Sequence, residues 1–433
     1  QAAAEGDGGA QTLFYGPLDE ALALARHQPA EVQEGLFLAT ENDVVAFLDS
    51  DNAWDRDFLS LCLAALDEPG VDAVYSASRI RRADDVDRYL AVETTRDDLI
   101  ANGNAVDLNT LVVSRRLLDL VGGFDERLRR WVDYDLVLRI FEATRPRLLR
   151  FIGVEYTHDD DPGRITNRET VGWETVVLSG RLADWEAERS RADRAPGVSV
   201  VVSGGSGWVD TLATVRSVLA DGERLLDVVV VDGSADPRAS RLLRLALDGQ
   251  DRVSLVGLPR DLRSSLGRNL GFLASTGRHV AFLEGGLEIA AGWVSALSEA
   301  LDADPTVGVG GSPVVGPDGR VESAGSVSGR LRMPPWRFLE GHPVEDLERT
   351  VPLDATAVDG SAMMVSADRF AAVEGFDPLY AGGLDDEDLS RRLDRHDGSV
   401  SRVLAVPPAR RRTPRAPWPA ERDESLAVFL DRG

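Results

Sequence analysis

The chain has 433 residues, of which 43% are hydrophobic and 28% are charged, as in an ordinary globular protein rather than a disordered one. The net charge is −25 and all 48 basic residues are arginine, which disfavours nonspecific binding to nucleic acid or anionic lipid. No apolar run approaches the ~20 residues of a membrane-spanning helix, and no leader pattern is present.

Three further features of the sequence concern the processing and the location of the protein. Cys62 is the only cysteine, which excludes an internal disulfide and favours a reducing, cytoplasmic compartment. The first residue is Gln1 rather than Met, which favours a trimmed or fragmentary product. A local basic patch lies between prolines near the C-terminus, and it is a candidate contact for a phosphate or for the inner face of a membrane. The patch consists of Arg410, Arg411, Arg412 and Arg415.

Along the chain, apolar strand-like runs alternate with helical patterns after a Gly/Ala-rich start, which predicts an α/β fold. The first clear strand is the run VVAFL at 44–48, and it ends on the turn Asp49-Ser50-Asp51. Two carboxylates one residue apart at the end of a buried strand can hold one divalent cation against a diphosphate. The same spacing recurs as solvated surface in this acidic chain, so the position after the strand is what singles out Asp49 and Asp51.

An acidic cluster opens a second feature, the helical pattern VDYDLVLRI that starts at Val132. A carboxylate near a helix N-terminus is stabilised as an anion, so Asp133 is a candidate catalytic base. The simpler interpretation is that Asp133 or Asp135 only caps the helix, and one can cap while the other acts as base. Further along, His158 precedes an acidic loop. It is a chemically reasonable third metal ligand, although lone histidines are usually structural or surface groups.

The chain then repeats itself. Asn109 to Asp125 (NTLVVSRRLLDLVGGFD) aligns without a gap with Ser361 to Asp377 (SAMMVSADRFAAVEGFD). Each stretch is preceded by an apolar strand with an acidic turn and followed by an acidic helix start. A whole domain has therefore been duplicated. The charged helical stretch 178–197, which ends in Ala-Pro-Gly, is the best candidate for a linker. We predict domains at 1–187 and 198–433, with 188–197 as the linker.

The two copies are not equally complete. The second begins at the strand 198–202, and helix, strand and helix patterns follow at 211–220, 227–236 and 238–247. At normal element lengths, the first copy lacks roughly two strands and a helix at its N-terminal edge. Such elements build the floor of a nucleotide pocket in doubly wound folds, so the first domain is expected to be N-terminally incomplete.

The second copy also differs at its acidic turn. The residues equivalent to Asp49-Ser50-Asp51 are Glu284-Gly285-Gly286, so the second carboxylate is missing and the metal site looks degraded. Because the preceding strand HVAFL is intact, restoring both carboxylates through Glu284→Asp with Gly286→Asp is expected to create an ion site.

These motifs resemble a known family. FLDSD, GGFDE and a W-x-D-x-D-L helix start in the first copy resemble the inverting family 2 glycosyltransferases of GT-A fold. The second copy adds a DGS turn, GRNLG, EGHP and DDEDL. The resemblance covers nearly all of residues 35–170 and 198–405. It implies two tandem GT-A-like, Rossmann-like α/β domains that move a sugar, with inversion, from a nucleotide-sugar donor to a hydroxyl of a glycan or lipid-linked acceptor.

The resemblance also implies roles for single residues. In the first copy, Asp49 and Asp51 would ligate Mn²⁺ or Mg²⁺ on the donor diphosphate, and His158 would match a metal histidine found in some members. Asp133 would be the base that deprotonates the acceptor, and Asp386 is its match in the second copy. The donor-binding positions of the second copy would be Asp232, Arg268, Asn269 and Glu284.

Two alternatives stay open. The first is a bifunctional polysaccharide polymerase in which both copies transfer sugars. The second is a non-catalytic glycan- or nucleotide-binding protein, because one copy lacks its nucleotide floor and the other lacks a metal-binding carboxylate. Arginines that neutralise a diphosphate would also allow metal-independent transfer in the second copy.

Overall fold

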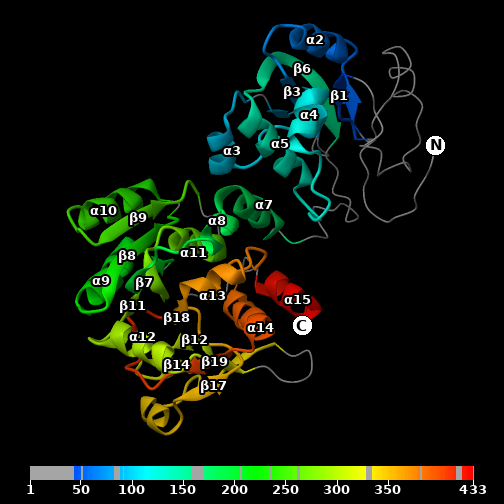
Figure 1. Cartoon of the computed structure of the whole chain (residues 1–433). Coiled ribbons are helices and arrows are strands. Elements are labelled where there is room, and N and C mark those ends of the chain that lie inside the picture. The colour runs from blue at the N-terminus through cyan, green and yellow to red at the C-terminus, as the bar shows by residue number, and fades with distance from the viewer. Residues whose placement is uncertain are drawn as a thin grey trace. The chain divides into compact units, whose positions relative to one another are not determined.

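The computed structural model describes residues 43–49, 52–81, 88–90, 92–157, 170, 172–204, 207–234, 236–260, 264–327, 334–380, 383–415 and 422–432. The chain divides into two compact units, Gln1–Val177 and Leu178–Gly433 (Figure 1). Asp51 and His158, two of the three predicted metal ligands, lie outside the described residues, as do residues 1–42. The predicted incompleteness of the first domain therefore stays a prediction.

The first unit is built on a mixed sheet with the strand order β1-β5-β3-β6-β2 and with β4 paired to β3. Apolar side chains of α2 and of three strands pack on one another in its core, with Phe58 and Val112 fully buried. The strands are β1 (Val44–Ala46), β2 (Ala53–Trp54), β3 (Ala73–Arg81), β4 (Arg88–Leu90), β5 (Leu111–Ser114) and β6 (Arg147–Thr157). The helices are α2 (Phe58–Leu66), α3 (Arg96–Asn102), η1 (Leu108–Thr110), α4 (Arg115–Val121), α5 (Val132–Ala143) and α7 (Gly172–Leu182), which contains the division between the units.

The second unit has a larger sheet with the order β17-β19-β12-β18-β10-β7-β8-β9. Helices cover both faces, so its central strands are continuous apolar runs. Helices α9, α10 and α12 pack on one face and α11, α13 and α14 on the other (Figure 1). The strands are β7 (Ala195–Ser203), β8 (Leu225–Asp232), β9 (Val253–Gly257), β10 (Gly277–Glu284), β12 (Val307–Gly311), β17 (Leu353–Ala355), β18 (Ala362–Ser366) and β19 (Val400–Val403). The helices are α9 (Trp208–Leu219), α10 (Pro237–Leu247), α11 (Ser264–Leu273), α12 (Trp293–Ala303), α13 (Ala367–Ala372) and α14 (Asp385–Asp397).

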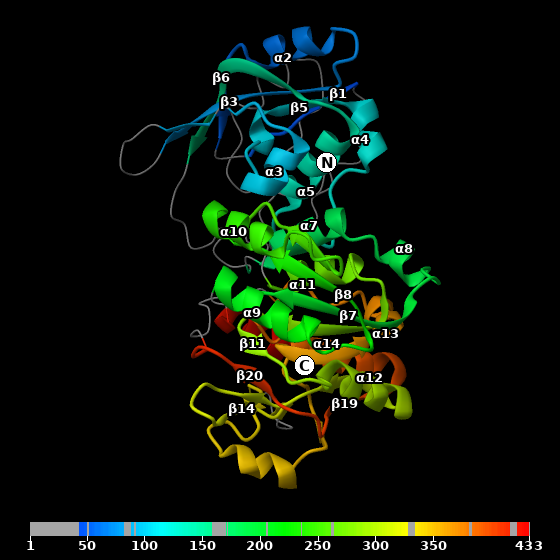
Figure 2. The same ribbon diagram turned by 90° about the vertical axis from the view of Figure 1, so that its left-hand side faces the viewer.

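Smaller elements complete the second unit. A second sheet has the order β11-β20-β13-β14, and β20 runs beside β11 (Figure 2). Its strands are β11 (Leu287–Glu288), β13 (Val314–Val315), β14 (Val321–Ser323) and β20 (Ala409–Arg411). The remaining elements are the pair β15 (Ser326–Val327) and β16 (Trp336–Arg337), η2 (Val344–Arg349), α8 (Trp185–Arg189) and α15 (Arg422–Arg432). Among the described helices, none has the length and hydropathy needed to span a bilayer.

The sequence repeat is also a structural repeat. The order β1-β5-β3-β6 in the first unit corresponds to β10-β18-β12-β19 in the second, with the same strand directions. Even the register agrees, because Val44 pairs with Ser114 and the equivalent His279 pairs with Ser366. Both serines also cap the helix that follows. The predicted α/β class with tandem units is therefore confirmed.

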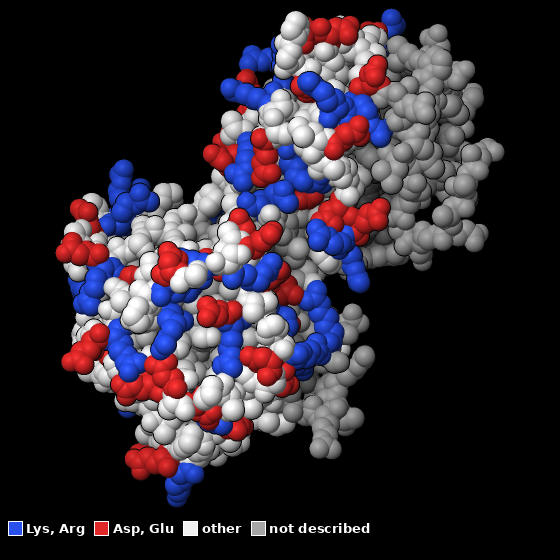
Figure 3. Space-filling model, viewed as in Figure 1, with Lys and Arg blue, Asp and Glu red and all other residues white. Residues whose placement is uncertain are grey.

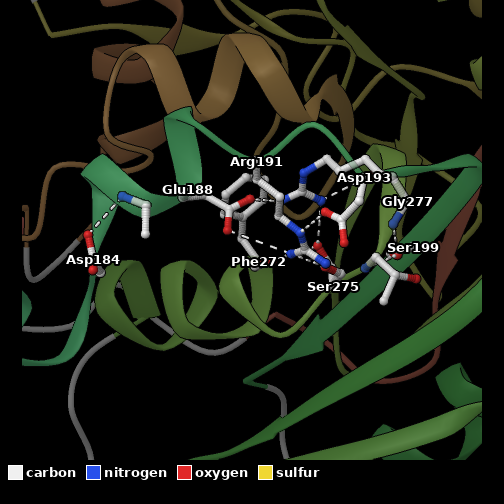
Figure 4. Close-up of polar contacts among 11 residues, drawn as sticks. Asp184, Glu188, Arg191, Asp193, Ser199, Phe272, Ser275 and Gly277 are labelled. Atoms are coloured by element: carbon white, nitrogen blue, oxygen red, sulfur yellow. Dashed lines mark hydrogen bonds and ion pairs between the residues drawn. The ribbon is translucent and has the colours of Figure 1, made fainter.

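The segment expected to be a linker packs on the second unit. Trp185 stacks on Phe272, and the buried carboxylate of Glu188 pairs with Arg194. Arg191 lies on the other side of the same carboxylate, at 3.6 Å (Figure 4). The guanidinium of Arg194 also lies 4.6 Å from the Phe272 ring centroid. Strand β7 begins directly afterwards, at Ala195. The division after Val177 comes before the predicted domain end at residue 187. Residues 185–197 differ from a free linker because Trp185 stacks on Phe272 of α11 and Arg194 donates to the Gly277 carbonyl at the start of β10 (2.9 Å).

This packing leads to a prediction about fragments. A fragment of residues 178–433 should fold and be more stable than one of residues 196–433, which lacks Trp185 and the Glu188–Arg194 pair. Deleting a core aromatic costs about 3–5 kcal/mol, and Trp185 is only partly buried, so we expect a loss of about 2 kcal/mol in the free energy of unfolding. Urea unfolding of both fragments measures it. Equal midpoints would show that the segment contributes nothing.

Candidate functional site

The first site residue, Asp49, follows β1 and is held by a buried asparagine. Asn109 accepts a hydrogen bond from the Asp49 backbone N–H (2.6 Å) and donates one to Asp49 Oδ2 (2.9 Å). The Asn109 amide also donates to Asp107 Oδ1 (2.9 Å), which in turn accepts from the Asn109 backbone N–H. Asn109 is only 3% exposed. This clamp fixes the Asp49 carboxylate at the end of the strand, and Asn52 donates a longer bond to the same oxygen (3.5 Å).

Asp133 lies in the first turn of α5, after Trp131, whose left-handed backbone (φ 64°) starts the helix abruptly. Asn104 Nδ2 donates to Asp133 Oδ2 (3.1 Å). Burial raises the pKa of Asp133 above its ordinary value, and the negative charge of Asp49 raises it further. Hydrogen bonds from the helix N-terminus and Asn104 oppose this effect. Asp49 and Asp133 are therefore close enough for the charge of one carboxylate to affect the other.

The neighbouring acid, Asp135, has a different task. It is buried, and Arg139 donates to it from both Nε (2.9 Å) and Nη2 (2.7 Å). The same guanidinium donates to the Val121 carbonyl (2.5 Å), which ties α5 to the end of α4. Asp388, Arg392 and the Val373 carbonyl repeat this arrangement in the second unit. Asp135 is thus structural, and Asp133 stays the predicted base.

Sequence reasoning missed the two asparagines. Asn109 was visible only as the first residue of the repeat, and Asn104 lay in no motif. A signal for the clamp exists, since Asp107 and its equivalent Asp359 both precede a repeated strand. Asp359 likewise accepts from the backbone and hydroxyl of Ser361, the residue equivalent to Asn109.

The described residues test the metal prediction only in part. No group of three or more histidine, cysteine, aspartate or glutamate side chains that could hold a metal occurs among them. Of the three predicted ligands, Asp49 alone is described, and its carboxylate is the hard oxygen donor that Mn²⁺ and Mg²⁺ prefer. The donor chemistry fits a divalent cation, with Asp51 two residues further along the turn.

In the second unit, Asp386 occupies the position of Asp133. Its Oδ2 accepts from the Gly360 backbone N–H (2.7 Å), and its Oδ1 accepts from the Glu387 backbone N–H (3.1 Å). Burial, and then the adjacent Asp386, raise the pKa of Glu387 well above its ordinary value, which favours the protonated form. The first unit has Tyr134 at this position, and its hydroxyl donates to the Leu99 carbonyl (2.7 Å). The carboxyl pair is therefore a property of the second unit.

Asp359 adds a third acid near Asp386, and it is compensated by arginines. Burial would raise the pKa of Asp359, but Arg415 and Arg337 at 3.6 and 3.5 Å hold it far below its ordinary value. This acid therefore stays ionised next to the Asp386 and Glu387 pair.

The predicted donor-binding pair Arg268 and Asn269 is engaged with the protein itself. Arg268 forms a buried ion pair with Asp385 and donates to the Gly360 carbonyl (3.1 Å). Asn269 accepts from the Phe376 backbone N–H (2.9 Å) and donates to the Phe376 carbonyl (2.7 Å). Both side chains therefore position the start of α14 and the turn before it. A role in donor binding stays a prediction.

Asp232 and Glu284 lie at the same edge of the large sheet, because β7, β8 and β10 are parallel. Asp232 is 8% exposed and accepts from the Ser234 backbone N–H (3.1 Å) at the tip of β8. Glu284 ends β10 and accepts from Arg411 Nη2 (3.0 Å). A role of Asp232 in donor binding stays a prediction, and the Glu284 carboxylate already has a cationic partner.

The two glycines after Glu284 lie where a side chain would be strained or crowded, and Gly286 is the position of the missing second carboxylate. A Cβ on Gly285 would lie 2.5 Å from the Gly204 carbonyl oxygen, and Gly286 has φ +97°, where side chains are strained. The Gly286 backbone N–H donates to Thr214 Oγ1 (2.9 Å). Aspartate at position 286 would therefore adopt a strained backbone conformation. The expectation that Glu284→Asp with Gly286→Asp creates an ion site stays a prediction.

The C-terminal arginines do not form a free basic patch. Arg411 is 6% exposed and pairs with Glu284 and Glu322. Arg412 pairs with Glu288 and Asp210, and Arg415 lies 3.6 Å from Asp359. On the face shown in Figure 3, arginine and acidic side chains alternate over the surface. Arg411 in particular is not accessible for the predicted membrane or phosphate contact, because its charge is buried between two carboxylates.

Comparison with known proteins supplies the family. The family model for glycosyl transferase family 2 matches residues 29–115 and 207–351, which together are more than half of the chain. The chain belongs to glycosyl transferase family 2. The two matched segments lie one in each unit, so both halves of this family 2 protein contribute to the assignment. The predicted resemblance to family 2 is thereby confirmed, with one matched segment in each unit.

Individual relatives are distant. Uncharacterized protein y4gI of Sinorhizobium fredii (strain NBRC 101917 / NGR234) is 27% identical over 319 residues, 66% of this chain and 34% of that protein. The chain thus spans about a third of the length of this curated relative. A crystal structure of GalNAc-T7 with UDP, GalNAc and Mn²⁺ is 16% identical in sequence and has a TM-score of 0.42. The match covers 51% of this chain and 44% of the GalNAc-T7 chain. The structure of mannosyltransferase PcManGT from Pyrobaculum calidifontis in complex with GDP-Man and Mn²⁺ is 16% identical in sequence and has a TM-score of 0.39. The match covers 60% of this chain and 72% of the mannosyltransferase chain.

Proposed function

We propose that the first unit transfers a sugar from a nucleotide-sugar donor to a hydroxyl of a glycan or lipid-linked acceptor, with inversion. The observation that carries the proposal is that the two aspartates at the start of α5 have different partners. Asp135 is neutralised by Arg139, whereas Asp133 is held by Asn104 and is within electrostatic reach of Asp49. A base and a metal-binding carboxylate in one site are what inverting transfer needs.

In this proposal Asp133 accepts the proton of the acceptor hydroxyl. The hydroxyl oxygen attacks the anomeric carbon of the donor sugar, and the bond from that carbon to the nucleoside diphosphate breaks on the opposite side. Asn104 orients the carboxylate, and the raised pKa makes it a better proton acceptor once ionised. Asp49 and Asp51 would hold Mn²⁺ or Mg²⁺, with His158 as a further ligand. The metal would neutralise charge on the departing nucleoside diphosphate.

The metal part of the proposal has its own test. Calorimetry of the full chain with Mn²⁺ and a nucleoside diphosphate should reveal a site that Asp51→Ala abolishes. Asp57→Ala is the matched control, because this exposed carboxylate lies on the same segment but after the turn. If the Asp51→Ala protein binds the cation as the unchanged chain does, the first unit has no metal site at this turn.

Two other functions remain candidates for the whole protein. A bifunctional polymerase is favoured by Asp386, since the base position is also acidic in the second unit. A non-catalytic binding protein is favoured by the buried, protein-bonded state of Arg268 and Asn269. Donor hydrolysis, measured with and without Mn²⁺ in Asp133→Asn and Asp386→Asn proteins, separates the three. One-unit catalysis is lost only in the first variant, dual catalysis is reduced in each, and a binding protein hydrolyses nothing.

A further inference from the structure

We infer that the guanidinium of Arg411 is the resident cation of the second unit, in the place that corresponds to the proposed metal site of the first, so that this unit binds no divalent cation. The inference rests on the repeat of strands and turns. It uses the proposed metal site only as the point of comparison.

The first step is the position of Arg411. Strand β20 pairs with β11, the strand directly after the Glu284 turn, with Leu287 opposite Arg411 (Figure 2). This pairing places Arg411, which is near the C-terminus of the chain, beside the turn at Glu284. The guanidinium donates to Glu284 Oε2 through Nη2 (3.0 Å) and to Glu322 Oε2 through Nε (2.8 Å). Two carboxylates therefore converge on one side chain that is 5% exposed.

The second step is the correspondence with the first unit. There β2, which follows the Asp49 turn, pairs with β6, with Ala53 opposite Glu155. Counting along the paired strands from these positions, Arg411 corresponds to Tyr156 and Thr413 to His158, the predicted metal histidine. The second unit thus has an arginine two residues before the position where the first unit has its candidate ligand.

The third step is the exclusion of a metal ion. Burial works against the charge of Arg411, but Glu284 and Glu322 raise its pKa above the ordinary arginine value, so the cation is permanent. A divalent ion needs several oxygen ligands. Gly285 and Gly286 supply no side-chain oxygen, and the Glu284 and Glu322 carboxylates are already bonded to the guanidinium. The metal that the family implies therefore does not fit this turn.

The consequence is that removing the arginine should create a cation site. Without Arg411, the partly buried carboxylates of Glu284 and Glu322 lose their shared countercharge and repel each other. A divalent cation with water ligands is the natural replacement, because both carboxylates already face a common point.

The experiment uses the full chain carrying Asp49→Ala and Asp51→Ala, so that the first unit does not contribute. Titration with Mn²⁺, followed by electron paramagnetic resonance of the free ion, should show no bound Mn²⁺. Adding Arg411→Met, which keeps the aliphatic volume, should produce a site for about one Mn²⁺ per chain. Adding Glu284→Gln as well should abolish it. Arg412→Met is the matched control, one position further along, and should bind none.

Two results overturn the inference. One is Mn²⁺ binding by the Asp49→Ala, Asp51→Ala chain that disappears with Glu284→Gln. The other is a folded Arg411→Met chain that binds no Mn²⁺. If Arg411→Met does not fold, Arg411→Lys retains the charge and should fold without binding Mn²⁺, and binding there overturns the inference too. A failure of the Asp51→Ala test described above would leave these outcomes unaffected, since it concerns the other unit.

Discussion

Replacing Asp133 with asparagine should lower sugar transfer by about 10²–10⁴-fold, the usual contribution of a general base, while donor binding is retained. Asparagine keeps the shape of the side chain and an oxygen that can accept the bond from Asn104, but it cannot take up a proton. Initial rates of transfer and calorimetric donor binding, measured on the same preparations, give the two quantities. A loss of less than tenfold would assign Asp133 to capping of α5.

Asp135→Asn is the matched control for that prediction, since Asp135 lies in the same turn but pairs with Arg139. It should reduce stability more than turnover, because it leaves a largely buried guanidinium without its carboxylate partner.

The pH dependence of transfer gives a second readout for Asp133. The base must be ionised to act, and burial and Asp49 raise its pKa. Activity should therefore fall as the pH drops through a pKa above the ordinary aspartate value. The acid limb should be absent from the residual activity of Asp133→Asn.

Replacing Arg268 with alanine should destabilise the second unit by about 3–5 kcal/mol, the range for breaking a buried ion pair from one side. The substitution leaves Asp385 buried without its cation and removes the guanidinium that lies 3.8 Å from the Phe376 ring centroid. Urea unfolding of the 178–433 fragment measures the loss.

The double variant Arg268→Met with Asp385→Asn is the control for Arg268, because it removes both charges and should recover most of the stability. If Arg268 instead binds the donor, as the sequence predicts, Arg268→Ala would weaken donor binding and leave the urea midpoint unchanged. That pattern would make Arg268 a ligand-binding residue rather than a positioning one.

The sequence alone determined the α/β class, the duplication and the candidate acids. The reason is that these properties are local. Strand and helix periodicity, and a gapless repeat such as Asn109 to Asp125 against Ser361 to Asp377, can be seen within short windows of the chain. Asp49 and Asp133 could be singled out because each stands at a strand end or a helix start.

Only the tertiary structure decided what each charged group does, because its partners come from distant parts of the chain. The choice between Asp133 and Asp135 depended on Arg139 reaching the end of α4. The place of residues 185–197 depended on Trp185 and Arg194 contacting Phe272, far along the sequence. Arg411 looked like one of four surface arginines. It is a buried cation because the pairing of β20 with β11 brings it to Glu284, a contact that no pattern in sequence spacing encodes.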